Sequence, residues 1–237
     1  MRSRHDSERV RFVSFSGVDG AGKSTQIALL CAHLEERGLR LRVVRFWDDV
    51  ARLTRLREGT GHRVFKGDKG IGSPEAPINR RDKNVGGWLM TGLRFFLYLV
   101  DAISLRTVVR KQLRGDCDFV IFDRYSYDEL ANLNLQNPLA RMYARVIRHI
   151  TPDPDVAFLL DADPETAHAR KPEYPIEFVR VNRRRYMRLN ELLGLFTIIE
   201  PTEIDAASQA VLSQALRVLA PEGSPEKTLP IGLSSET

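Results

Sequence analysis

A segment near the start of the chain carries the residue types that bind phosphate. Residues 17–25 read Gly-Val-Asp-Gly-Ala-Gly-Lys-Ser-Thr and fit the pattern G-x-x-x-x-G-K-[ST] without a mismatch. In this pattern the glycines let backbone N–H groups face phosphate oxygens, the lysine reaches the β- and γ-phosphates, and the next hydroxyl ligates Mg²⁺. We therefore predict a site for the phosphates of ATP, in which Lys23 is catalytic and Ser24 ligates the metal. The residues of the predicted site are Gly17, Asp19, Gly20, Ala21, Gly22, Lys23, Ser24 and Thr25.

A second group of polar residues follows an apolar run at 118–123, which is typical of a buried strand. Asp123 is the candidate to hold Mg²⁺ through water or to orient the attacking group. Arg124 is the candidate to bind an acceptor phosphate, because its planar fork suits two phosphate oxygens. The alternative is a salt-bridged strand end. Asp161 follows another apolar run and is a rival to Asp123 as the acid near the metal. We interpret it as structural or supporting, because the residues 163–165 that follow it are typical of a helix N-terminus.

The elements that must position these residues alternate between strand and helix patterns. This alternation predicts an α/β fold, with a parallel sheet and helices on both faces. The expected strands span residues 10–16, 39–46, 118–123, 155–161 and 196–200, and the expected helices 26–37, 88–114, 138–150, from 164, 175–193 and 205–219.

Two segments fall outside this pattern. Residues 59–87 form a basic, Gly-rich insertion, in which the charged run 80–83 is interpreted as a mobile solvated loop rather than a substrate clamp. Residues 221–237 form a Pro-, Glu- and Ser-rich tail that we expect to be disordered. The rest, residues 1–220, is predicted to be a single domain.

Composition narrows the class of protein. The chain has 237 residues, a formal net charge of +5 and two cysteines without metal or redox spacing. No apolar run approaches the roughly 18 residues of a membrane span, and no secretory signal pattern is present. We expect a cytoplasmic protein without a membrane partner. Direct nucleic-acid binding ranks low because no binding-module signature occurs.

Over about residues 10–219 the chain resembles the thymidylate kinase family of P-loop nucleoside monophosphate kinases. Four segments carry the resemblance in order: residues 17–26, 120–125, 154–167 and 178–186. The resemblance implies a P-loop NTPase fold with a five-stranded parallel sheet and a small helical lid, here residues 168–176. It also implies ATP and Mg²⁺ as cofactors. Asp19 would touch the acceptor's sugar hydroxyl and Arg124 its phosphate.

The resemblance also bears on the catalytic arginine. One subgroup of the family keeps this arginine in the P-loop, where the present chain has Gly20. The resemblance then implies that the lid supplies it, with Arg170, next to Lys171, as the natural source.

The acceptor half of the site departs from the family. Ala102 stands where the family places an arginine in its long central helix, Tyr98 replaces the stacking phenylalanine, and Asp128 and Asn132 replace small polar and amide residues. The predicted acceptor-binding residues are accordingly Asp19, Tyr98, Arg124 and Asp128, and dTMP is expected to be a poor acceptor.

The leading function is transfer of the γ-phosphoryl of ATP to a nucleoside monophosphate or related phosphorylated small molecule. A kinase of a non-nucleotide sugar phosphate and a nucleotide-dependent switch with weak NTPase activity are the alternatives. The oligomeric state is left open, with a homodimer as one candidate. The basic helix at 175–193 is either a solvated surface or contributes one or two phosphate-facing arginines.

Overall fold

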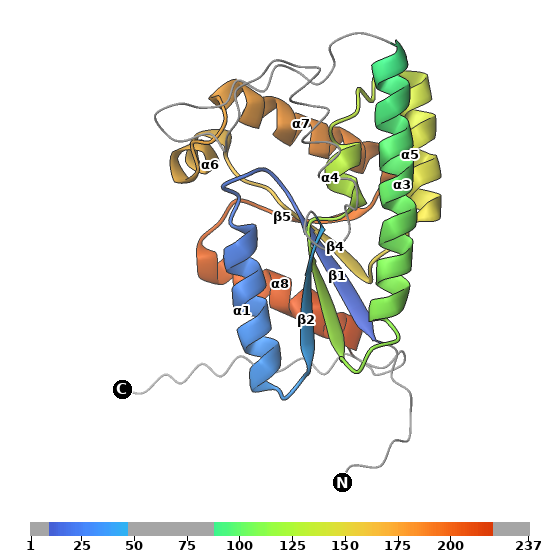
Figure 1. Ribbon diagram of the computed structural model, residues 1–237. Helices are drawn as coiled ribbons and strands as arrows, with labels where there is room; N and C mark the ends of the chain where they lie inside the picture. The colour runs from blue at the N-terminus through green and yellow to red at the C-terminus, as the bar shows by residue number, and fades with distance from the viewer. Residues whose placement is uncertain (1–9, 47–87, 220–237) are drawn as a thin grey trace.

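A computed structural model describes residues 10–46 and 88–219, and within them five parallel strands form one sheet in the order β2-β3-β1-β4-β5 (Figure 1). The strands are β1 (Arg11–Ser16), β2 (Leu41–Arg45), β3 (Phe119–Asp123), β4 (Val156–Leu160) and β5 (Phe196–Ile199). The prediction of a five-stranded parallel α/β sheet is confirmed.

Helices cover both faces of this sheet (Figure 1). α1 and α8 pack together on one face, and α3 with α4 and α5 on the other. α6 and α7 lie beyond the carboxyl ends of the strands. The bounds are α1 (Lys23–Glu36), α3 (Trp88–Gln112), α4 (Ser126–Leu130), α5 (Pro138–Ile150), α6 (Pro164–Arg170), α7 (Ile176–Leu193) and α8 (Ile204–Leu219).

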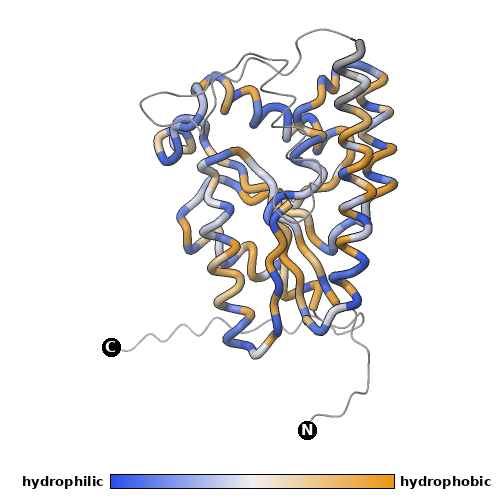
Figure 2. Tube along the Cα trace, in the orientation of Figure 1, coloured by the Kyte–Doolittle hydropathy of each residue, from blue (hydrophilic) through white to orange (hydrophobic). Residues whose placement is uncertain are grey.

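The three central strands β3, β1 and β4 are buried on both faces, which explains why they are mostly apolar, whereas the edge strand β2 is partly exposed. Every residue of β4 is buried, and all but the first residue of β1 are buried. Figure 2 shows hydrophobic residues concentrated along the strands. This core places the polar residues that follow β1 and β3 at one edge of the sheet.

The helix ends follow the local signals. Pro138 and Pro164 occupy first-turn positions after the side-chain caps Asn137 and Asp163. Gly194 ends α7 in the left-handed conformation. The predicted bounds agree within three residues, but α4 was not predicted, because five residues are too few to show a helical period.

Several predictions concern residues outside the described part of the chain. They are the insertion at 59–87, its charged run at 80–83, and the tail at 221–237. The single domain over 1–220 therefore stays a prediction. Among the described residues, no helix combines the length and apolar character needed to cross a membrane.

Candidate phosphoryl-transfer site

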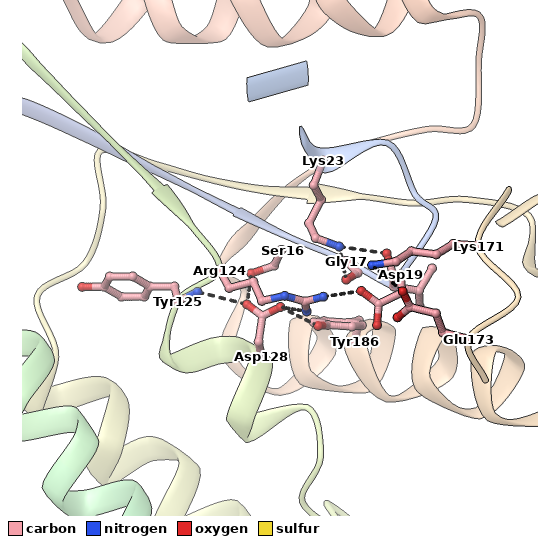
Figure 3. A network of polar contacts seen from close by, with 11 residues as sticks. Ser16, Gly17, Asp19, Lys23, Arg124, Tyr125, Asp128, Lys171, Glu173 and Tyr186 are labelled. Atoms are coloured by element: carbon pink, nitrogen blue, oxygen red, sulfur yellow. Dashed lines mark hydrogen bonds and ion pairs between the residues drawn. The ribbon is translucent and has the colours of Figure 1, made fainter. Parts of the chain in front are cut away.

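Two neighbouring strands bring the predicted catalytic residues together. β1 pairs in parallel with β3, with Phe15 opposite Asp123. The phosphate-binding loop after β1 and the Asp-Arg-Tyr segment that ends β3 therefore emerge at the same edge of the sheet. Figure 3 shows Lys23, Asp19, Arg124 and Asp128 in one polar network there.

Two glycines of the loop are required by close backbone approaches. Gly17 has φ +141°, and a Cβ there would lie 2.6 Å from the carbonyl oxygen of Leu160. Gly20 has φ +84°, and a Cβ there would lie 2.1 Å from the carbonyl oxygen of Ala167 in α6. With α6 in this position, any side chain at position 20 would collide with its backbone.

Lys23 is the first residue of α1 and is buried at 7% exposure. Its Nζ donates to the carbonyl oxygens of Gly17 at 2.8 Å and Val18 at 2.9 Å. Burial lowers the pKa of Lys23 to about 8, and the positive charge of Arg124 acts in the same direction. The ammonium is thus held inside the loop, where the phosphate oxygens of a bound nucleotide would compete with these two carbonyl oxygens for it.

Arg124 directs its guanidinium toward the loop. Its Nη2 contacts Asp19 Oδ1 at 2.5 Å, and its Nη1 contacts Asp128 Oδ1 at 3.0 Å. Burial alone would lower the pKa of Arg124, but the negative charges of Asp128 and Asp19 outweigh it and raise that pKa above its usual value. The cation therefore stays charged within a partly buried cluster.

Asp128, predicted to bind the acceptor, is surrounded by protein donors. Its Oδ2 accepts from Ser16 Oγ at 2.7 Å and from the backbone N of Tyr125 at 3.1 Å. Its Oδ1 accepts from Tyr186 Oη at 2.7 Å as well as from Arg124. Sequence reasoning missed Ser16 and Tyr186, and no local signal identifies either as a partner of Asp128.

The residues predicted to hold Mg²⁺ are of a suitable kind. Ser24 is exposed at the start of α1, and Asp123 is half-buried at the end of β3. Neither side chain makes a hydrogen bond or ion pair to any residue that the structure describes. A hydroxyl and a carboxylate are hard oxygen donors, which Mg²⁺ prefers. These residues fit the ion.

The predicted lid, residues 168–176, begins in α6, the helix that approaches the loop at Gly20. Arg170 ends α6, is exposed, and forms no ion pair within the described residues. Lys171 contacts Glu173 at 3.3 Å, and Figure 3 draws both near Asp19. The structure thus places Lys171 in the network.

On α3, Tyr98 and Ala102 are both buried, at 7% and 2% exposure. Position 102 is thus occupied by a buried methyl group, and α3 offers no guanidinium to an acceptor at this position.

The arginines of α7 divide between two environments. Arg183 donates to both carboxylate oxygens of Asp161 at 2.6 Å. This ion pair joins the end of β4 to α7 and is compatible with a structural role for Asp161. Arg180 pairs with Glu165 and Glu177. A cavity of about 340 Å³ lies between α7 and the segment 133–136, and is lined on the helix by Val181, Arg184, Arg185 and Arg188.

Comparison with known proteins identifies relatives of this chain. No family model matches the chain. A probable thymidylate kinase of Methanothermobacter thermautotrophicus is 28% identical over 217 residues, which cover 89% of this chain and 94% of the relative. The chain is thymidylate kinase-like. A thymidylate kinase of Fervidobacterium nodosum is 26% identical over 162 residues, covering 67% of this chain and 70% of that protein.

A third thymidylate kinase, from Solidesulfovibrio magneticus, is 32% identical over 163 residues, covering 65% of each chain. With these thymidylate kinases, the prediction of a nucleotide-binding phosphotransferase is confirmed, as is the α/β P-loop fold.

Proposed function

We propose that the protein is an ATP- and Mg²⁺-dependent nucleoside monophosphate kinase. The observation that carries the proposal is the meeting of Lys23 and Arg124 at one edge of the sheet. They come from segments on neighbouring strands and are close enough for their charges to interact. One cation is placed for the donor phosphates and the other for an acceptor phosphate.

On the donor side, ATP with Mg²⁺ supplies the phosphoryl group when bound. The backbone of residues 17–25 would bind its phosphates, and Lys23 would offset the charge that develops during transfer. Ser24 would hold the metal directly and Asp123 through water. Loop glycines, a helix N-terminus and hard oxygen donors support this assignment.

On the acceptor side, Arg124 would bind the phosphate of the monophosphate and Asp19 its sugar hydroxyl. Tyr98 stays a predicted contact for the base. Because Ala102 supplies no guanidinium, we propose that dTMP is a weaker acceptor than at least one other monophosphate. The lid cation would come from Arg170 or from its neighbour Lys171, which Figure 3 draws among the residues of the polar network.

The relatives favour this kinase over the two alternatives, a sugar-phosphate kinase and a nucleotide-dependent switch. The test is to incubate the protein with ATP, Mg²⁺ and each of a panel of nucleoside monophosphates, and to measure ADP. Acceptor-dependent ADP supports the kinase. Slow ADP release that no acceptor accelerates would favour the switch. A cytoplasmic location and a homodimer stay predictions.

A further inference from the structure

We propose that Asp128 and Tyr186 position the guanidinium of Arg124 for the acceptor phosphate and do not themselves contact the acceptor. The inference rests on the proposed kinase function, in which Arg124 binds that phosphate. It assigns both residues a role in acceptor recognition through a third side chain (Figure 3).

The first argument is the accepting capacity of Asp128. A carboxylate has about four lone-pair positions. Four donors occupy them: Ser16 Oγ and the Tyr125 backbone N on Oδ2, and Arg124 Nη1 and Tyr186 Oη on Oδ1. The residue is only 3% exposed. A negatively charged acceptor would gain nothing from a buried carboxylate whose positions are already used.

The second argument is the conformation of Arg124. Its backbone has φ +69°, which non-glycine residues rarely adopt. Its backbone N donates to the carbonyl oxygen of Phe15 at 3.0 Å, which ties this turn to β1. The side chain is then held at two nitrogens, by Asp19 and Asp128. Holding a long side chain in place before the substrate arrives reduces the entropy lost on binding.

The third argument is the place of Tyr186. It lies on α7, the helix that follows the lid, and its ring is buried. Burial and the charge of Asp128 raise the pKa of Tyr186 well above its usual value, so the phenol remains a donor at neutral pH. Because Tyr186 and Arg124 share Asp128 Oδ1, the position of α7 directly affects the guanidinium.

Two variants separate positioning from simple structural support. Asp128→Asn keeps the shape but offers one accepting oxygen. The amide NH₂ must then face either Arg124 Nη1 or the Tyr125 backbone N–H, and neither of these groups can accept a hydrogen bond. Tyr186→Phe removes one hydroxyl and leaves the ring packing intact.

Tyr127→Phe is the matched control. Tyr127 is a buried tyrosine whose hydroxyl donates to a different carboxylate, Asp153 Oδ1, at 3.1 Å. The variant loses the same chemical group as Tyr186→Phe, but the hydroxyl that is removed bonds Asp153 and not the carboxylate that holds Arg124.

The kinetic measurement is the Michaelis constant for the best acceptor and for ATP in each variant, with the unfolding midpoint alongside. We expect the acceptor KM to rise about tenfold or more in Asp128→Asn and severalfold in Tyr186→Phe, while the KM for ATP changes less than about twofold. Tyr127→Phe should lower the unfolding midpoint only. Equal rises in both KM values, or the same acceptor effect in Tyr127→Phe, would overturn the positioning role.

A second measurement does not depend on turnover. In protein labelled with ¹⁵N-arginine, the Arg124 guanidinium signal is assigned by its loss in Arg124→Lys. Its slow hydrogen exchange should be lost in Asp128→Asn, accelerated in Tyr186→Phe and kept in Tyr127→Phe. Unchanged exchange in Asp128→Asn would overturn the positioning role. A wild-type protein that phosphorylates no monophosphate would refute the proposed function, and the exchange data would still decide the positioning of Arg124.

Discussion

Arg124 forms an ion pair with Asp19, with Nη2 and Oδ1 2.5 Å apart, although the two residues are 105 positions apart in the chain. This pair joins the end of β3 to the phosphate-binding loop. It also means that an acceptor phosphate would compete with a carboxylate for the same guanidinium. Acceptor binding is then an exchange of one anion for another at Arg124, with Asp128 holding the other nitrogen.

Replacing Arg124 by lysine should impair acceptor use more than ATP binding. A single ammonium cannot reach Asp19, Asp128 and a phosphate in the planar geometry of a guanidinium. We expect kcat/KM for the acceptor to fall about tenfold or more, with the dissociation constant for ATP nearly unchanged. A collapse of ATP affinity at constant acceptor KM would show that the two halves of the site are reversed.

Lys23→Ala should lower turnover by orders of magnitude and leave the fold intact, because it removes the charge placed for the transferred phosphoryl group. Steady-state kinetics and circular dichroism of the purified variant provide the check. A folded Lys23→Ala protein with the wild-type kcat would refute the assignment of catalysis to this loop.

Lys23 should also make the ligand-free protein less stable at neutral pH. Its pKa is about 8 in the folded protein against 10.5 ordinarily, so folding disfavours the protonated form. The cost is present below pH 8 and fades as the pH rises from 8 toward 10.5. We expect Lys23→Met to raise the free energy of unfolding at pH 7 by on the order of 3 kcal/mol. Denaturation of both proteins at pH 7 and 10 tests this, and a gain that grows with pH would contradict it.

Gly20→Ala should displace α6, because the new Cβ would lie 2.1 Å from the carbonyl oxygen of Ala167. Gly38→Ala is the control, since Gly38 lies outside the loop and also has positive φ, at +76°, but no neighbouring atom lies within 4 Å of the added Cβ. Both variants carry backbone strain of about 1–2 kcal/mol. Only Gly20→Ala should also lose most of its activity, because only its Cβ collides with α6. The kcat value reports the activity, and the unfolding midpoint reports the strain. Equal losses in the two variants would argue against a role for the contact with α6.

dTMP should be a poor or inactive acceptor compared with at least one other phosphorylated compound. By the resemblance, the family's acceptor arginine corresponds to position 102, which here is a buried alanine. One lost charged hydrogen bond costs about 1.5–3 kcal/mol, or roughly ten- to a hundredfold in kcat/KM. Kinetics across monophosphates decide the matter. A dTMP value of about 10⁴ M⁻¹s⁻¹ or more, above every other acceptor, would contradict the prediction.

The sequence by itself determined the elements of the fold and the donor half of the site. Strand and helix patterns, proline and glycine positions and the loop at 17–25 are local signals, readable without knowing what packs against them. They predicted the five strands and six of the seven described helices. The same local reading placed Arg124 directly after a buried strand, and the structure brings it close to Lys23.

The tertiary structure alone decided which side chains meet in the acceptor half. Asp128 has the partners Ser16 and Tyr186, which lie 112 and 58 residues away in the chain. No periodicity encodes a contact over such separations, because it arises only when β1, α4 and α7 converge beyond the sheet. The approach of Ala167 in α6 to Gly20 depends likewise on how distant segments pack, because these two residues lie on separate elements of the fold. For that reason residue types alone predicted an acceptor-binding Asp128, whereas packing surrounds its carboxylate with donors from the protein.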